Sequence, residues 1–494
     1  MGRRPGLLHS RKTFDIEFRK TQLKRFWALV DENEEALRAA LLQDLGKPLV
    51  EATGIERGVH LPKHNSSSPF SPIPHGTCLK EVILTPRFPA VSLFKNEIVF
   101  MLEKLDEWLA PEEPYVPEHF RRLSPTIYKQ PKGICLVIGA WNYPFFLTAS
   151  PFLGVIASGN TGIMKPSELA PHTAMLMASL VPKYLDQTCY RVINGGEPVA
   201  TELLKMQYDH IFYTGGASVG KIVMKAAAEF LTPVTLELGG KSPAIVSKKA
   251  DVKLAAKRIA WGKFACAGQT CVAPDYALVE EEVHEEFLEA MKQVIQEFYE
   301  GDPKAEHKMG RIVNKTHWER VTGLIAETKG KVVCGGGSEA ESLYVEPTVV
   351  SNVSLDDPLM VQEIFGPILP VISVQSLLAA CELIPKISPK PLGLYIMTED
   401  TTEMEYVQLN TTSGGMAIND TMMQIGVPNM PFGGTGPSGM GSYHGKASID
   451  TFSHRRSVVN VPMAADEAFE WRYPNGDQVA KFKFYKDNLE AKLP

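Results

Sequence analysis

Two residues of this chain, Cys271 and Glu237, have side chains suited to nucleophilic and general-base chemistry. Cys271 ends the run Gly268-Gln269-Thr270-Cys271 just after a predicted helix, and a cysteine in such a loop can be exposed and activated. Glu237 lies between two leucines at a predicted strand end, where burial would raise its pKa toward that of a useful general base. Each residue also has a plain structural interpretation. A free cysteine is commonly a small buried hydrophobic residue, and a glutamate on an edge strand lies at the surface.

A second group of residues could bind a dinucleotide. Gly215, Gly216 and Gly220 lie where a predicted strand turns into a helix, and glycine there lets the backbone approach a pyrophosphate. Lys165 and Glu168 follow another strand end, where an acidic residue can accept hydrogen bonds from ribose hydroxyls. A glycine turn and a solvated turn that bind nothing would also explain these patterns.

Six motifs, taken together and in this order, resemble the aldehyde dehydrogenase superfamily over nearly the whole chain. They are Trp141-Asn142-Tyr143-Pro144, Lys165-Pro166-Ser167-Glu168, Leu236-Glu237-Leu238-Gly239-Gly240-Lys241, Gly268-Gln269-Thr270-Cys271, Gln362-Glu363-Ile364-Phe365-Gly366-Pro367 and Pro431-Phe432-Gly433-Gly434. Tyr443-His444-Gly445-Lys446 and Phe452-Ser453-His454 resemble the class 3, fatty-aldehyde branch, and the fungal apocarotenal-type subgroup is similar.

The resemblance implies a role for each reacting residue. Cys271 would add to an aldehyde as a thiolate, and Asn142 with the backbone N–H of Cys271 would stabilise the oxyanion. Glu237 would activate the water that hydrolyses the resulting thioester. The implied cofactor is NAD, with NADP as an alternative, and no metal is needed. The implied cofactor-binding residues are Trp141, Lys165, Glu168, Gly215, Gly216, Gly220, Glu363 and Phe365.

Composition excludes several classes of partner. The net charge is −6, which gives no basic surface for nucleic acid, and no apolar run reaches the length of a membrane span of about 18 residues. The seven cysteines include no CxxC pair, so neither a disulfide framework nor a zinc site is expected. We therefore expect a cytoplasmic protein without an integral membrane segment, while peripheral membrane association and weak mitochondrial targeting stay open.

The elements predict an α/β fold with two doubly wound parallel-sheet domains and a β arm. From about residue 130, short apolar runs alternate with amphipathic helices, as in parallel sheets with crossover helices. The helices expected over 13–45 and 96–109 flank a proline-rich segment, 58–94, interpreted as a disordered insertion. The expected parts are a dinucleotide-binding domain (1–111 and 132–238), a catalytic domain (239–423) and a bridging arm for oligomerisation (112–131 and 424–494).

The predicted function is oxidation of an aldehyde to a carboxylic acid by a homodimer. The class 3 resemblance implies medium- or long-chain aliphatic aldehydes, with apocarotenoid or aromatic aldehydes as the alternative. Two rival functions use the same fold. One is a catalytically silent structural or binding protein, which would be expected to lack Cys271, Glu237 or Asn142. The other is a thiol esterase that works without a cofactor.

Overall fold

The structure is a computed structural model that describes residues 11–48, 51, 90–305 and 308–488. Two compact units separate: the larger runs to Trp108 and resumes over Pro131–Ser453, and the smaller comprises Leu109–Gln130 and His454–Pro494. Residues 424–453, which the sequence assigned to the arm, thus belong to the larger unit. The physical reason is a strand, β16 (Gly439–Met440), that pairs antiparallel with the end of β6 (Val234–Glu237).

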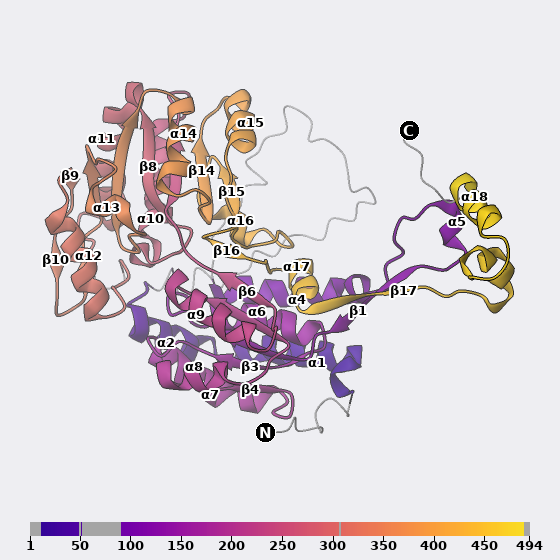
Figure 1. Ribbon diagram of the computed structural model, residues 1–494. Helices are drawn as coiled ribbons and strands as arrows, with labels where there is room; N and C mark the ends of the chain where they lie inside the picture. Colours follow the sequence, from indigo (N-terminus) through magenta and orange to yellow (C-terminus); the bar gives the residue numbers. More distant parts are fainter. Residues whose placement is uncertain (1–10, 49–50, 52–89, 306–307, 489–494) are drawn as a thin grey trace, which may run out of the picture. The chain divides into compact units, whose positions relative to one another are not determined.

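The first sheet of the larger unit is parallel apart from its edge strand β16. Figure 1 labels β3, β4, β6 and β16 of this sheet. Its strands follow one another in the order β16, β6, β5 (His210–Thr214), β2 (Ile134–Ile138), β3 (Thr161–Lys165) and β4 (Tyr190–Val192). β2 and β5 are almost wholly buried, as their continuous apolar runs require. Strands β3 and β4 extend the sheet on one side of β2, whereas β5 and β6 extend it on the other side. The strand order therefore reverses beside β2. In such sheets ligands bind at the carboxyl ends of the strands at this reversal.

Helices around the first sheet differ from the predicted ones in two places. The helix expected over 13–45 is two helices, α1 (Ile16–Glu32) and α2 (Glu34–Leu45), separated at Asn33. Helix α4 (Ala90–Leu109) includes 90–94, which the sequence assigned to the insertion. No proline lies within 90–109, and Phe94 is fully buried with its ring edge-on to Phe26 and Phe145. The remainder of the predicted insertion, 58–89, lies outside the described residues.

The second sheet is also parallel apart from its last strand, β9. Its order is β15 (Gly415–Ile418), β14 (Gly393–Met397), β7 (Ser242–Val246), β8 (Pro274–Glu280), β13 (Ile368–Val374), β12 (Thr348–Ser351) and β9 (Lys331–Cys334). Strands β7, β8 and β14 are buried along their whole length and, with α10 (Val252–Phe264) and α11 (His284–Tyr299), form one large apolar core. The expected α/β class with two sheets is confirmed.

The other elements of the larger unit connect these layers. They are η1 (Lys12–Phe14), α6 (Phe146–Ala157), α7 (Pro171–Tyr184), α8 (Glu197–Leu204), α9 (Ala217–Ala228), η3 (Ala265–Gly268), η4 (Glu281–Val283), α12 (Lys315–Glu327), β10 (Ser338–Glu339), β11 (Tyr344–Val345), α13 (Pro358–Val361), α14 (Leu377–Ile387), α15 (Thr401–Asn410), α16 (Met423–Gly426) and α17 (Lys446–Thr451). Among the residues described, no helix is both long and apolar enough to cross a membrane.

The smaller unit joins two segments far apart in the sequence. Its two-stranded sheet pairs β1 (Thr126–Pro131) with β17 (Ser453–Val458). Glu112 ties these strands together, because its carboxylate contacts Lys129 Nζ at 2.8 Å and Arg455 Nη2 at 2.7 Å. Three helices complete the unit: α5 (Glu118–Arg121), η5 (Met463–Arg472) and α18 (Gln478–Asn488).

Candidate active site

The loop that carries Cys271 has an unusual backbone. Cys266, Ala267 and Gly268 are three successive residues with left-handed φ values of 53°, 52° and 75°. Non-glycine residues adopt this region at a cost, and such strain gathers at functional sites. At Gly268 a Cβ atom would lie 2.2 Å from the carbonyl oxygen of Gly366, so only glycine fits. The turn places Cys271 between α10 and β8, where its side chain stays partly exposed while that of Cys266 is buried.

The loop after β2 packs directly against this nucleophile loop. Asn142 is 3% exposed, and its Nδ2 donates to the carbonyl oxygen of Gln269 at 2.9 Å. The hydroxyl of Tyr143 and that of Thr270 are 3.0 Å apart and share a hydrogen bond. The backbone N–H groups of Cys271 and Val272 lower the pKa of the Cys271 thiol and so favour its thiolate. The loops after β2 and before β8 therefore bring the Asn142 amide and the backbone N–H of Cys271 into one site, and donors of this kind can stabilise a developing oxyanion.

Glu237, at the end of β6, is a buried carboxyl group whose two oxygens have no hydrogen-bond partner among the described residues. It is only 2% exposed, so the alternative of a surface glutamate is wrong. Burial holds its pKa well above the usual value for a glutamate. A buried carboxyl group without partners is costly to keep in a fold, and here it lies close enough to Cys271 to influence that thiol.

The thiol of Cys271 has a raised pKa. The largest cause is enclosure by the protein, and the negative charges of Glu363 and Glu237 add to it. The thiol is therefore protonated at rest, and its proton must leave before the sulfur can attack a carbonyl. The site brings together a thiol, amide groups and a buried carboxyl group, which are the kinds of group that acyl-transfer chemistry uses.

Glu363 approaches the same site from the loop before β13. Burial, and then the charge of Asp275, raise the pKa of Glu363 to about 8. Its Oε1 has no partner among the described residues, and a Cβ atom at Gly239 would lie 2.0 Å from its Oε2. Glycine at position 239 thus makes room for this carboxyl group. An unpartnered buried acceptor of this kind suits the hydroxyl groups of a ribose.

Phe365 and Trp141 form an aromatic wall next to Glu363. Phe365 has a φ of 46°, which is rare for an aromatic residue, and its ring stands edge-on to Trp141 at 5.3 Å between centroids. On its other side Trp141 lies 5.3 Å from the ring of His317, a neighbour that sequence reasoning missed. His317 lies in α12 outside every motif of the sequence analysis, so no sequence signal predicts that it contacts Trp141.

The residues expected to bind the adenosine half lie at the carboxyl ends of β3 and β5. Lys165 is buried, and its Nζ donates to Glu168 Oε2 at 2.6 Å. Burial alone would raise the pKa of Glu168, but hydrogen bonds from Lys165 and from its own backbone N–H outweigh it and lower the pKa. Glu168 is thus an ionised acceptor beside a lysine at the edge where dinucleotides bind in this kind of sheet.

Each of the three predicted glycines meets a geometric requirement. Gly215 has a φ of 155°, and a Cβ atom there would lie 2.3 Å from the hydroxyl oxygen of Tyr213. Gly216 is the residue before α9, so the free N–H groups of that helix start at the turn. At Gly220 a Cβ atom would lie 2.9 Å from Leu238, which explains the close packing of α9 on the sheet. These features fit a pyrophosphate at the start of α9.

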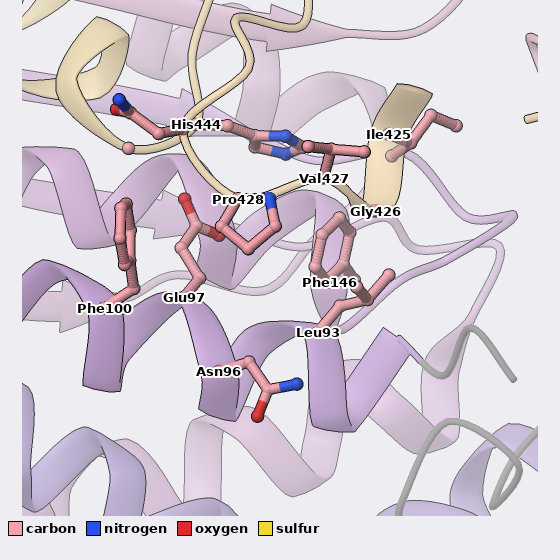
Figure 2. A pocket seen from close by; sticks show the side chains of 12 residues that line it. Leu93, Asn96, Glu97, Phe100, Phe146, Ile425, Gly426, Val427, Pro428 and His444 are labelled. Carbon is pink, nitrogen blue, oxygen red and sulfur yellow. The ribbon is translucent and has the colours of Figure 1, made fainter. Parts of the chain in front are cut away.

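A mostly apolar cavity of about 70 Å³ lies among α4, the start of α6, residues 425–429 and His444 (Figure 2). Its apolar wall comprises Leu93, Phe100, Phe146, Ile425, Val427 and Pro428. Its polar lining residues are Asn96, Glu97, Asn429 and His444. Burial raises the pKa of the Glu97 carboxyl group to about 7. Burial, followed by the charges of Glu237, Glu97 and Cys271, raises the pKa of Tyr443, so this phenol is close enough to interact with both Glu97 of the cavity and the Cys271 thiol.

Comparison with known proteins identifies the family of this chain. The model of the aldehyde dehydrogenase family matches residues 95–458. The rat protein named "Aldehyde dehydrogenase, dimeric NADP-preferring" is 42% identical over 94% of this chain and 95% of its own length. The mouse "Aldehyde dehydrogenase family 3 member A2" is 40% identical over 97% and 92%, respectively. The solved structure of Staphylococcus aureus AldH in its substrate-bound state has a TM-score of 0.84 and 37% identity, covering 99% of this chain and all of that one. This chain belongs to the aldehyde dehydrogenase family and groups with its class 3 members.

Proposed function

We propose that this protein oxidises aldehydes to carboxylic acids with NAD(P)⁺ through a thioester on Cys271. The observation that carries the proposal is the unpartnered, buried carboxyl group of Glu237 near the thiol, with the Asn142 amide held on the nucleophile loop. A silent structural protein has no need to keep such a carboxyl group. The presence of Cys271, Glu237 and Asn142 in one site therefore argues against that rival.

The reaction divides among three residues of this chain. The Cys271 thiol first releases its proton to water, and the resulting thiolate forms a C–S bond to the aldehyde carbon while the carbonyl π pair moves to oxygen. The oxyanion that develops accepts hydrogen bonds from Asn142 Nδ2 and the backbone N–H of Cys271. When bound, NAD(P)⁺ supplies the hydride acceptor that converts this adduct into a thioester. Glu237 then takes a proton from water as the water attacks the thioester, and the acid and the Cys271 sulfur separate.

The residues that would hold the cofactor lie along one edge of the first sheet and in the loop before β13. Lys165 and Glu168 would bind the adenosine ribose, and Gly215, Gly216 and Gly220 would line the pyrophosphate turn. Glu363 would hold the nicotinamide ribose beside Phe365 and Trp141. The ionised Glu168 suits a free ribose hydroxyl and so NAD, whereas Lys165 can accommodate a phosphate and so NADP.

The substrates we propose are medium- or long-chain aliphatic aldehydes. The apolar wall contributed by α4, α6 and 425–428 supports an apolar tail, because burying such a tail is favourable by about 0.8 kcal/mol for each CH₂ group. Aromatic and apocarotenoid aldehydes are the alternative, which would extend the likeness to the fungal apocarotenal-type subgroup.

Further proposals concern organisation and location. We propose a homodimer in which β1 and β17 extend a sheet of the partner subunit, because each strand of this two-stranded sheet is an edge strand. The rat relative is itself named dimeric. Apart from residues 424–453, which lie in the larger unit, the predicted domain boundaries remain proposals, and so does the cytoplasmic location. The cytoplasmic proposal rests on cysteine usage alone.

The test is formation of NAD(P)H with a panel of aliphatic, aromatic and apocarotenoid aldehydes, comparing wild type with Cys271→Ala. We expect activity in the wild type that disappears in the variant, with the highest kcat/KM for aliphatic chains. Hydrolysis of a thioester substrate that proceeds at full rate without cofactor, together with no NAD(P)H formation by a folded protein, would establish the esterase instead.

A further inference from the structure

A buried lysine from outside the six motifs contacts the backbone of Asn142. Lys47 follows α2 after Gly46, and it is 3% exposed. Its Nζ donates to the carbonyl oxygen of Asn142 at 2.7 Å and lies 3.6 Å from the centroid of the Tyr143 ring. Burying an ammonium group costs free energy, and this buried ammonium group contacts the peptide that carries the proposed oxyanion donor.

Glu51, four residues after Lys47, contacts the nucleophile loop instead. The backbone N–H of Cys266 donates to Glu51 Oε2 at 3.0 Å. Burial raises the pKa of the Glu51 carboxyl group, and the nearby charge of Lys47 opposes that rise, so the two side chains form an interacting pair. The Cys266 thiol closes the cluster by donating to the Asn142 carbonyl oxygen at 3.4 Å.

The contacts converge on one peptide. The Asn142 carbonyl oxygen accepts from both Lys47 and Cys266, which uses its two lone pairs and fixes the plane of the peptide. The side chain of the same residue reaches the nucleophile loop through Gln269. An oxyanion donor must lie within about 0.5 Å of its productive position, and this cluster controls both the donor and the loop that carries the thiol.

We propose that Lys47, paired with Glu51, is a positioning residue that sets the Asn142 amide against Cys271 for oxyanion stabilisation. The proposal rests on the proposed aldehyde oxidation. Among the described residues Lys47 contacts Asn142 and Tyr143 rather than Cys271, and it acts through the backbone of Asn142. The position of Lys47 between both loops accounts for a buried charge that the motifs leave without a role.

The test compares Lys47→Met with Lys95→Met in single-turnover NAD(P)H formation at saturating cofactor. Lys95 is the matched control because its ammonium pairs with Asp31 and lies 4.5 Å from the Trp27 ring centroid, away from the site. We expect the first-turnover rate to fall about 10- to 100-fold in Lys47→Met, less than the loss of about 10²–10³ for removal of a whole oxyanion donor. We expect Lys95→Met to stay within about twofold, and the KM for cofactor to change little in either variant.

A double-mutant cycle separates positioning from a general structural effect. If Lys47 acts through Asn142, then Lys47→Met should cost almost nothing further in an Asn142→Ala background. Full additivity of the two losses, or an equal loss in Lys95→Met, would overturn the proposal. Glu51→Gln, which keeps an acceptor for the Cys266 N–H, replaces Lys47→Met in the same cycle if that variant does not fold. A wild type that forms no NAD(P)H would instead overturn the proposed function, independently of the cycle.

Discussion

Replacing Glu237 by glutamine isolates the step in which water attacks the thioester. Both carboxylate oxygens lack hydrogen-bond partners among the described residues, so the substitution breaks no visible contact and removes only the capacity to accept a proton. The amide has nearly the same shape and is buried in the same place. The fold should therefore tolerate the change, and the effect should fall on hydrolysis of the acyl-enzyme rather than on its formation.

The expected magnitude follows from the role. A positioned general base typically contributes about 10²–10⁴-fold, so steady-state turnover of Glu237→Gln should fall by that factor. Formation of the thioester does not use Glu237, and the first turnover should therefore remain fast. The assay is rapid mixing with saturating aldehyde and cofactor, in which the variant should release about one NAD(P)H per active site in a burst and then almost stop.

The raised pKa of Glu237 gives an independent measurement on the same variant. A carboxyl group whose folded-state pKa is above its unfolded value stabilises the fold at low pH, and this stability is lost as pH rises through the folded pKa. Glu237→Gln lacks this pH-dependent contribution to stability. The melting temperature of the variant relative to that of the wild type should therefore increase as pH rises above about 4.5, near the ordinary glutamate pKa. Wild-type steady-state turnover that persisted in Glu237→Gln, or a variant without a burst, would refute the assignment of Glu237 as the base.

Two further substitutions test the loops and the cofactor edge. Gly268→Ala should destabilise the protein by at least about 2 kcal/mol and abolish turnover, because the left-handed φ costs about 1–2 kcal/mol and the new Cβ would lie 2.2 Å from the Gly366 carbonyl oxygen. Thermal unfolding measures this loss of stability. The control is Gly323→Ala on α12, where the new Cβ meets open space and the effect should be neutral or slightly stabilising. Glu168→Gln should raise the ratio of kcat/KM for NADP to kcat/KM for NAD by about tenfold, equivalent to about 1.4 kcal/mol. The reason is that the substitution removes an ionised acceptor for the ribose and leaves Lys165 in place. An unchanged ratio in initial-rate assays would show that Glu168 does not select the cofactor.

The sequence predicts those features whose signal is local. Buried parallel strands such as β2 and β5 are continuous apolar runs, and the residues of the reacting site lie in motifs that can be read without their partners. β16 could not be predicted, because a two-residue strand has no periodicity and exists only through its register with Leu236 and Glu237. Lys47 is similar: its role depends on a carbonyl oxygen 95 residues away, and no property of its own neighbourhood indicates burial.

The strained residues around Cys271 form one connected feature. Cys266 and Ala267 on one loop and Phe365 on the other all adopt left-handed φ values, at a cost of about 1–3 kcal/mol each. The two strained segments meet where Gly268 packs against the Gly366 carbonyl oxygen, so neither can relax without displacing the other. The first segment leads to Cys271, and the second contains Glu363 and Phe365, whose ring forms the aromatic wall with Trp141. Shared strain of this kind fixes the thiol relative to the proposed nicotinamide pocket before any ligand binds. The reaction needs such preorganisation, because a displacement of about 1 Å can cost 10²-fold in rate.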